Sequence, residues 1–400
     1  MNINEEIDRI WNEKIKVNLQ NEENSIINQY SKEIDSKLDN FKNELCKNID
    51  NIVKIAEKNI LINKMNKRTE NLIYQNNNNL INAVLLCLCN IKSFVFFNLG
   101  IEKEDILKKI KEIKNNSYFS LIVKLMNKLW IKADEPNDGY KTKTFHDILK
   151  NDDPLIYNCK NPGKIIAFIL SKLNEEFKLN QNINNINQNN KIESLDEFKK
   201  ICKDNKNKIN EEFFVNYQIK EKCINFDANK YYFEQRPIIN LFIEPEVQLS
   251  VVGKGKFKDI NLKESFNFLL NDNDMHVNKY CEICAIWHDF IINNYVQSLN
   301  NNILIINLDR EKDTLLERNI IYPLHLELTY GENITKEYEL ISVLYQNEND
   351  YYNVYCKNLF NGKWIKYNED EEIKKVMDEN IVLNCEKVLL LIYKKKRLNI

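Results

Sequence analysis

The residues of this chain best suited to nucleophilic or metal chemistry are its ten cysteines and four histidines. A thiolate beside an imidazole forms a nucleophile with its base, and clustered thiols hold zinc. The histidines are far apart, at positions 146, 276, 288 and 325, and only one CxxC pair occurs, Cys281 and Cys284. A thiol–imidazole pair or a metal site therefore has few starting points in this sequence.

Two of the cysteines, Cys87 and Cys89, lie in or beside the apolar segment 83–88. A thiol in such a segment favours a buried position with a raised pKa over a reactive one. His325 falls in a predicted strand, where a structural role is the better interpretation. The chain has no glycine-rich phosphate loop, no HExxH motif and no carboxylate pair at a telling spacing.

Charge and hydropathy argue against a nucleic-acid-binding protein and against a membrane protein. The 57 basic and 59 acidic residues give a net charge of −2, so we expect no nucleic-acid partner. The longest apolar runs, 83–88 and 388–393, are too short to cross a bilayer, so we expect no membrane association. The first 20 residues are polar and charged, which predicts reduced thiols in a cytoplasmic or nuclear protein.

The N-terminal segment 1–70 has apolar residues at spacings of three and four and contains neither proline nor glycine. This pattern predicts a helical extension, as a long hairpin or a short coiled coil. An amphipathic extension of this kind either packs on its own domain or docks a partner protein.

In the rest of the chain, the spacing of apolar residues changes at about residue 210 from a helical pattern to short apolar runs typical of strands. Helices are predicted over 80–90, 106–113, 120–129 and 165–177, and the last is opened by the Asn-Pro-Gly sequence at 161–163. Residues 178–200 contain an Asn-rich, low-complexity insertion. Short apolar runs then predict strands, so the fold class is α+β. The predicted strands are 213–217, 231–233, 238–243, 247–252, 303–308, 324–328, 338–345, 351–356 and 388–393.

Five collinear segments resemble one family. They are LIYQNNNNLINAVLLCL at 72–88, NPGKIIAFILSKLNEEF at 161–177, PIINLFI at 237–243 with LKESF at 262–266 and YCEIC at 280–284, NILIINLDR at 302–310, and a last segment that begins with YELISVL at 338–344 and continues through YYNVYCKN, GKWIKYN and VLLLIY. This set is similar to the motifs of the ubiquitin-specific proteases, which are cysteine deubiquitinases. The resemblance covers residues 71–396 and implies a papain-like fold with a helical thumb and a β-sheet palm and fingers.

The resemblance also implies that the catalytic residues have been replaced. The family's nucleophilic cysteine, at the start of a helix, matches Asn79, and its general-base histidine matches Tyr351. The orienting acid matches Asn368, and the oxyanion asparagine matches Tyr74. A carboxamide is no nucleophile, and a phenol with a reference pKa of about 10 is a poor base at neutral pH. We therefore expect an inactive member of the family, a pseudo-deubiquitinase.

The family's zinc-binding knuckles imply a partial metal site. Cys281 and Cys284 match one knuckle, and Cys223 matches half of the other, whose second cysteine is replaced by Phe226. Structural zinc takes four ligands, so the fourth has to come from elsewhere, such as Cys202 or His276. The expectation is no cofactor, with zinc as the alternative.

The resemblance places the ubiquitin tail beside Asn161, Lys164 and Tyr352. The family's acidic residues in this helix are Asn161 and Lys164 here, a change that weakens binding of a basic tail by about a few kcal/mol. Three functions stay open: a scaffold subunit that recruits a partner through residues 1–70, a ubiquitin-binding module, and an active deubiquitinase with an unrecognised thiol.

Overall fold

The computed structural model describes most of the chain. The described residues are 3–66, 79–99, 117–130, 142–179, 192–204, 207–223, 228–242, 260–263, 265–266, 275–281, 286–299, 301–310, 319–330, 334–347, 351–367, 374–376 and 378–396. The chain divides into two compact units, Met1–Met65 and Asn66–Ile400. Each unit is described by itself below.

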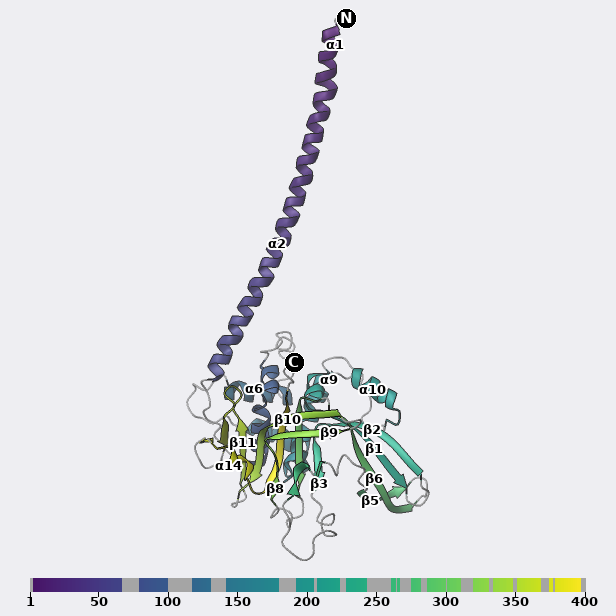
Figure 1. Ribbon diagram of the computed structural model, residues 1–400, viewed down its shortest axis with the longest axis vertical. Helices are drawn as coiled ribbons and strands as arrows, with labels where there is room; N and C mark the ends of the chain where they lie inside the picture. Colours follow the sequence, from purple (N-terminus) through teal and green to yellow (C-terminus); the bar gives the residue numbers. More distant parts are fainter. Residues whose placement is uncertain are drawn as a thin grey trace, which may run out of the picture. The chain divides into compact units, whose positions relative to one another are not determined.

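The N-terminal unit is one long helix (Figure 1). It consists of α1 (Ile3–Ile10), a π-helical turn (Trp11–Ile15) and α2 (Lys16–Asn66). The helical extension predicted for 1–70 is confirmed over Ile3–Asn66, but the hairpin is wrong, because no glycine or proline interrupts the 51 residues of α2. The apolar side chains described along this helix are exposed, Ile34 and Phe41 among them.

The second unit has helices first and strands afterwards, as the sequence predicts. Its described helices are α3 (Asn79–Cys89), α4 (Lys92–Asn98), α6 (Tyr118–Trp130), α7 (Lys143–Asp152), α8 (Pro154–Tyr157), α9 (Pro162–Leu179), α10 (Leu195–Asp204), α11 (Lys208–Phe213) and α14 (Glu379–Leu383). The helix predicted at 106–113 and the strand predicted at 247–252 lie outside the described residues.

Eight strands form the larger sheet, in the order β13-β12-β11-β10-β14-β7-β3 with β9 beside β10. Its pairs are antiparallel except for β3 with β7. This sheet contains the last motif of the resemblance in β10, β11, β12 and β14. Its strands are β3 (Ile239–Phe242), β7 (Ile303–Asp309), β9 (His325–Tyr330), β10 (Ile334–Gln346), β11 (Tyr352–Lys357), β12 (Trp364–Tyr367), β13 (Lys374–Val376) and β14 (Val388–Lys395).

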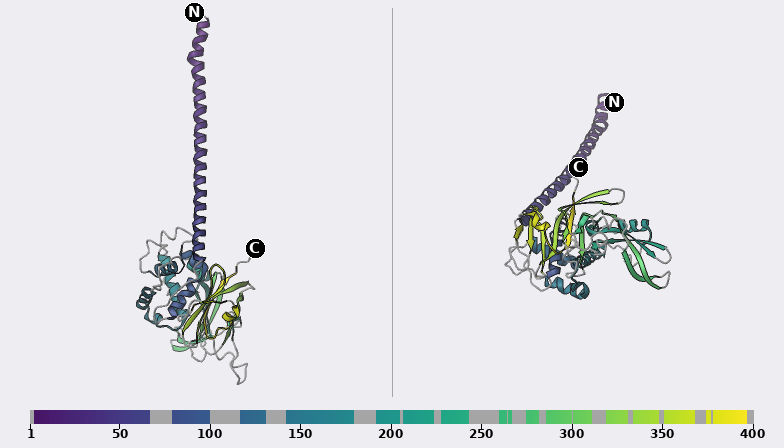
Figure 2. Two further views of the ribbon diagram at one scale, coloured as in Figure 1. Left: turned by 90° about the vertical axis from the view of Figure 1, so that its left-hand side faces the viewer. Right: turned by 60° about the horizontal axis from the view of Figure 1, so that its bottom comes forward.

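A second, four-stranded antiparallel sheet of order β2-β1-β6-β5 projects from the body of this unit (Figures 1 and 2). Its strands are β1 (Val215–Cys223), β2 (Ala228–Arg236), β5 (Met275–Cys281) and β6 (Ile286–Ser298). The short strands β4 (Ile260–Asn261) and β8 (Ile320–Ile321) pair separately. Burial alternates along β1, as expected for a sheet with one covered face.

Helix α10 corrects the end of the predicted low-complexity insertion. Leu195–Asp204 are helical, whereas the prediction extended the insertion to residue 200. The helix forms because Ser194 Oγ accepts the Glu197 N–H at 3.4 Å and the ring of Phe198 stacks on Phe233 at 5.5 Å. Phe198 thereby anchors this polar segment to β2.

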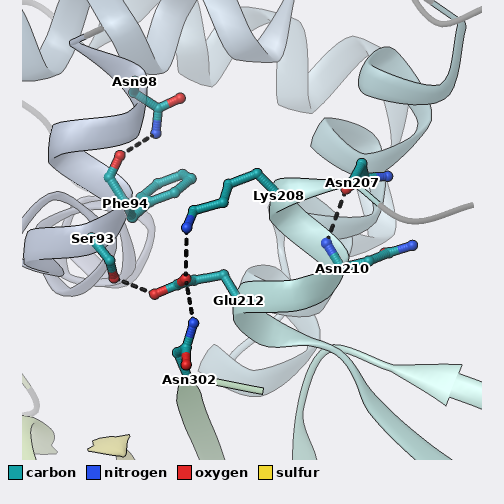
Figure 3. A network of polar contacts seen from close by, with 8 residues as sticks. All are labelled: Ser93, Phe94, Asn98, Asn207, Lys208, Asn210, Glu212 and Asn302. Atoms are coloured by element: carbon teal, nitrogen blue, oxygen red, sulfur yellow. Dashed lines mark hydrogen bonds and ion pairs between the residues drawn. The ribbon is translucent and has the colours of Figure 1, made fainter. Parts of the chain in front are cut away.

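A buried carboxylate connects the helices to the larger sheet (Figure 3). Glu212 is 2% exposed and accepts hydrogen bonds from Ser93 Oγ and from Asn302 Nδ2, the latter at 3.1 Å. Lys208 Nζ lies 3.7 Å from the same carboxylate. Helix α4, helix α11 and the residue that precedes β7 therefore meet at one charged group.

No single described helix is long and apolar enough to cross a bilayer. Helices α3 and α4 reach that length only together, and they are bent by 83° at the break between them. Their apolar side chains are buried in the second unit, Leu85 and Val95 among them.

Candidate functional site

The site predicted from the resemblance is built on α3, which lies against β10 and β11. This helix is apolar on all sides: every described side chain from Leu80 to Cys89 is buried. A helix that is apolar all round belongs in a protein core. Asn79 is its first residue, so it takes the helix-start position at which the family places its nucleophile.

The C-terminal part of α3 is fixed to the sheet by polar contacts. Ser342 Oγ of β10 lies 3.3 Å from Cys87 Sγ and 3.2 Å from Cys356 Sγ of β11. Tyr367 of β12 donates its hydroxyl to Asn90 Oδ1 at 3.3 Å. These contacts hold the helix in one position across three adjacent strands.

The thiols of α3 lie in the core, as predicted. Cys87 and Cys89 are 0% exposed. Burial raises the pKa of Cys89, and the neighbouring thiol of Cys87 adds to the shift. Burial likewise raises the pKa of Cys356, and Cys87 adds to that shift too. The environments of Cys89 and Cys356 therefore do not favour a thiolate.

Tyr351, at the position of the family's histidine, precedes β11 directly and is 42% exposed. Its backbone N–H donates to Asn347 Oδ1 at 2.8 Å, and the Asn347 N–H donates to the Tyr351 carbonyl at 2.8 Å. This reciprocal pair closes the connection between β10 and β11. Tyr352 follows as the first residue of β11 and is half-buried.

Two of the four positions that the resemblance matches to catalytic residues lie among the described residues. Asn79 begins α3, and Tyr351 stands at the start of β11, a strand that α3 contacts. Tyr74 and Asn368 lie outside the described residues. The structure brings together the two elements that position a nucleophile and its base in the family, with an amide and a phenol in these places.

The four histidines of the sequence all lie on other elements. His146 is on α7, His276 on β5, His288 on β6 and His325 on β9. His146 contacts α3, because its Nε2 lies 3.0 Å from Oδ1 of the buried Asn82. Burial lowers the pKa of His146, so the ring is neutral and fits a donor from Nε2 to the amide oxygen. Sequence reasoning missed this contact because residues 82 and 146 share no motif.

The start of α9 holds the predicted tail-binding residues. Asn161 Oδ1 accepts the Lys164 N–H at 3.2 Å, so the amide caps the helix, and the Lys164 side chain is exposed. Next to them the Gly163 N–H donates to Oδ1 of Asn307 in β7 at 3.2 Å. A Cβ on Gly163 would lie 2.2 Å from Asn307 Cγ, so this helix start requires glycine. Asn307 in turn donates to Asn240 Oδ1 at 2.9 Å.

Two of the predicted zinc ligands, Cys223 and Cys281, end strands of the four-stranded sheet. Cys223 ends β1 and is buried opposite Phe290 of β6, whereas Cys281 ends β5 opposite Ile286. The four-residue offset along β6 corresponds to about 13 Å. Cys284 and the side chains of Cys281 and His276 lie outside the described residues, and Cys202 Sγ contacts Asn216 Oδ1 at 4.0 Å.

Among the side chains that the structure describes, no group of three or more Cys, His, Asp or Glu residues is arranged to hold a metal ion. Zinc requires its sulfur ligands at about 2.3 Å from the metal, a condition that the offset between Cys223 and Cys281 does not meet. The zinc site stays a prediction, and the register of β1, β5 and β6 does not fit it.

Several solved structures share this fold. The chain is similar to the yeast SAGA deubiquitinating module, at 16% identity and a TM-score of 0.55 over 82% of this chain and 69% of the solved one. A module of Ubp8, Sgf11, Sus1 and Sgf73 bound to monoubiquitin matches at 16% identity and a TM-score of 0.57, over 82% and 70% of the two chains. The same module bound to ubiquitin aldehyde matches at 16% identity and a TM-score of 0.55, over 82% of this chain and 70% of the solved one.

Of the two sequence comparisons, one finds a match and the other does not. No curated protein sequence matches this chain. The sequence pattern described as "Ubiquitin carboxyl-terminal hydrolase" matches residues 71–393, which include α3, α9, the four-stranded sheet and, except for the last two residues of β14, the eight-stranded sheet. This match spans most of the 400 residues, and the shared fold agrees with it. The chain therefore belongs to the ubiquitin carboxyl-terminal hydrolase family.

Proposed function

We propose that this protein is a pseudo-deubiquitinase, a family member that binds other proteins and does not cleave ubiquitin conjugates. The observation that carries the proposal is the pair of residues at the two key positions. Helix α3 begins with Asn79, and Tyr351 precedes β11, while the histidines of the chain lie on α7, β5, β6 and β9. Cysteine-dependent acyl transfer needs a thiolate and a base at these positions.

The thiols of α3 do not supply an alternative nucleophile. Cys87 lies eight residues after Asn79, about 12 Å further along the helix axis. It contacts Ser342, which also contacts Cys356, and no imidazole is among these partners. A water-excluded thiol with no base cannot attack the carbonyl of a ubiquitin tail.

A covalent probe tests the loss of activity. Ubiquitin with a C-terminal vinyl sulfone or propargyl group labels the nucleophilic cysteine of active family members. We expect no labelled band with the full chain. A band that disappears on Cys87→Ser or Cys89→Ser would establish an active enzyme and refute the proposal.

Ubiquitin is the first candidate ligand, because the similar structures include a module bound to monoubiquitin. The start of α9 argues for weak binding of the tail. Asn161 keeps the helix-capping contact but carries no charge, and Lys164 adds a positive charge. Since Lys164 is exposed, solvent screens it, and the penalty is about 1 kcal/mol rather than several.

A ubiquitin titration separates the two binding roles. We expect Lys164→Glu to tighten ubiquitin binding about fivefold if the tail lies along α9, since one exposed pair contributes up to about 1 kcal/mol. Lys203→Glu, an exposed change on α10, is the matched control and leaves affinity unchanged. Absence of binding even at millimolar ubiquitin would leave the scaffold role, with a partner protein other than ubiquitin.

A further inference from the structure

The long helix α2 carries an apolar stripe that the described structure leaves exposed. Ile34 is 62% exposed, Phe41 61% and Ile52 67%. Isolated exposed apolar residues are ordinary, but a continuous stripe on one helix marks an interaction surface. The stripe needs a partner, and the sequence of the helix indicates which one.

From Ile27 to Ile55 the stripe follows a heptad repeat that Ser31 and Asn48 interrupt, and polar residues continue the same spacing to Gln20 and Asn59. Its positions alternate in steps of four and three, which is the spacing of the contact seam in a two-stranded coiled coil. The repeat begins after the π-helical turn at Trp11–Ile15, which rotates the earlier residues off the seam. The seam residues are Gln20, Asn24, Ile27, Ser31, Ile34, Leu38, Phe41, Leu45, Asn48, Ile52, Ile55 and Asn59.

We propose that α2 forms an antiparallel two-stranded coiled coil with α2 of a second copy of this chain. In the register that we infer, the sequence numbers of facing residues add up to 79. Polar seam residues then meet polar ones, because Gln20 faces Asn59 and Ser31 faces Asn48 of the second copy. The apolar layers are Ile27 with Ile52, Ile34 with Leu45, and Leu38 with Phe41; only the layer of Asn24 with Ile55 is mixed.

The charges beside the seam agree with this register. In an antiparallel pair, residues that flank the seam face their equivalents on the second helix. Lys37 then faces Glu44 of the second copy, and Asp35 faces Lys42. The two-fold symmetry repeats both pairs, which gives four attractive contacts. Such complementary flanking charges set helix orientation in coiled coils.

In a parallel dimer and in the shifted antiparallel registers, the charges that flank the seam repel each other. In a parallel dimer the flanking position of Lys37 faces Lys42, a repulsive pair that occurs twice. An antiparallel register shifted by one heptad, with sum 86, sets Leu38 against Asn48 and brings the two Lys42 residues together. The opposite shift, with sum 72, sets Ser31 against Phe41 and brings the two Asp35 residues together.

The antiparallel arrangement has a structural consequence. The two chains leave the coiled coil at Asn66, at opposite ends of the helix pair. At 1.5 Å per residue these two exits are about 80 Å apart. The two chains therefore continue into their family domains from opposite ends of the helix pair, and a dimer with two such domains can bind two sites on one assembly. This inference does not depend on whether the domains bind ubiquitin.

Disulfide trapping in the full chain tests orientation and register together. Cys46 is exposed, so all variants carry Cys46→Ser, and this parent is the control that gives no crosslink. Asn24→Cys and Ile55→Cys are made in separate chains. These positions are chosen because they form the one mixed layer, where a substitution should destabilise the coiled coil least. We expect a crosslinked dimer only when the two variants are mixed. Crosslinking of either variant alone, with none between the two, would show a parallel dimer and overturn the proposal.

Charge reversal provides a second test with its own rescue. Lys37→Glu sets Glu against Glu44 twice, so we expect the dimer Kd to rise roughly tenfold, as measured by sedimentation. Glu44→Lys added to that variant restores the attraction and the Kd. A parallel dimer predicts the opposite sign, because Lys37→Glu would then face Lys42. A wild-type chain that stays at 47.8 kDa at micromolar concentrations, or that pairs only with a different protein, would overturn the proposal.

Discussion

Helix α3 has two ends that differ in what they do. At its C-terminal end Cys87 and Asn90 contact three strands through Ser342, Cys356 and Tyr367. At its N-terminal end the family's chemistry would take place, and there the chain has Asn79. The first end makes the contacts that the fold needs, whereas the second carries a carboxamide at the position that the resemblance matches to the family's nucleophile.

The difference follows from how the two ends contribute free energy. A core contact is shared among many side chains, so replacing one residue of the C-terminal end leaves a cavity or an unpaired polar group. A reactive group at a helix start contributes to the transition state of a reaction and little to folding. A member that no longer cleaves can therefore change Asn79 and Tyr351 freely, while Cys87 stays where the sheet holds it.

The largest effect on the free energy of unfolding is expected at the contact of α9 with β7. Gly163→Ala sets a Cβ 2.2 Å from Asn307 Cγ and displaces the Gly163 hydrogen bond. We expect a loss of about 4 kcal/mol from overpacking and the disturbed amide pair, measured by urea unfolding.

Gly362 is the matched control for this substitution. It has a φ of 67°, but nothing lies within 4 Å of the position of an added Cβ. Gly362→Ala should cost about 1 kcal/mol, from backbone strain alone. Equal losses at the two glycines would contradict the close approach of α9 to β7.

The next effect concerns the buried carboxylate between the helices and the sheet. Glu212→Ala leaves Ser93 and Asn302 without their acceptor and Lys208 without its ion pair. We expect a loss of about 3 kcal/mol, because hydrogen bonds to a buried charged group are among the strong ones. Glu211→Ala, on the exposed side of the same helix, should change stability by less than about 0.5 kcal/mol.

A smaller effect is expected from the pH dependence of His146. Burial lowers its pKa in the folded chain, so the unfolded chain binds the proton more readily. The resulting contribution to stability is present above the unfolded pKa of about 6.5 and is lost as the pH falls below it. Unfolding between pH 7 and pH 5 should therefore show a declining stability.

His146→Gln isolates this contribution, because an amide can still donate to Asn82 Oδ1. We expect the variant to lose less stability than the wild type between pH 7 and pH 5. Identical pH profiles for His146→Gln and the wild type would show that the ring is not held neutral by burial.

The sequence predicts the fold well where the pattern is repeated. The runs at 303–308, 338–345, 351–356 and 388–393 became β7, β10, β11 and β14, since strands of the core are apolar over their whole length. The burial of Cys87 and Cys89 was predicted for the same reason. The collinear motifs predicted the family and the helices α3 and α9, although no single motif is specific.

Other features could not be predicted from spacing. The contact of His146 with Asn82 and the Glu212 cluster join residues far apart in the chain, and no local pattern encodes such pairs. The strand run at 213–217 began too early, because Phe213 still belongs to α11, which Asn207 caps. The Asn-rich insertion was drawn too long, because composition does not reveal that Phe198 packs on Phe233.

The smallest effect on the free energy of unfolding is expected at Tyr351, the position that the resemblance matches to the family's histidine. Tyr351 is 42% exposed, and its backbone, not its ring, makes the contacts with Asn347. We expect Tyr351→Phe and Tyr351→His to change the free energy of unfolding by less than about 0.5 kcal/mol. Tyr351→His restores only one of the two reactive groups, so ubiquitin probes should still leave the chain unlabelled. A labelled band in Tyr351→His would show that a thiol stands within reach of this position, and the two ends of α3 would then no longer differ as described.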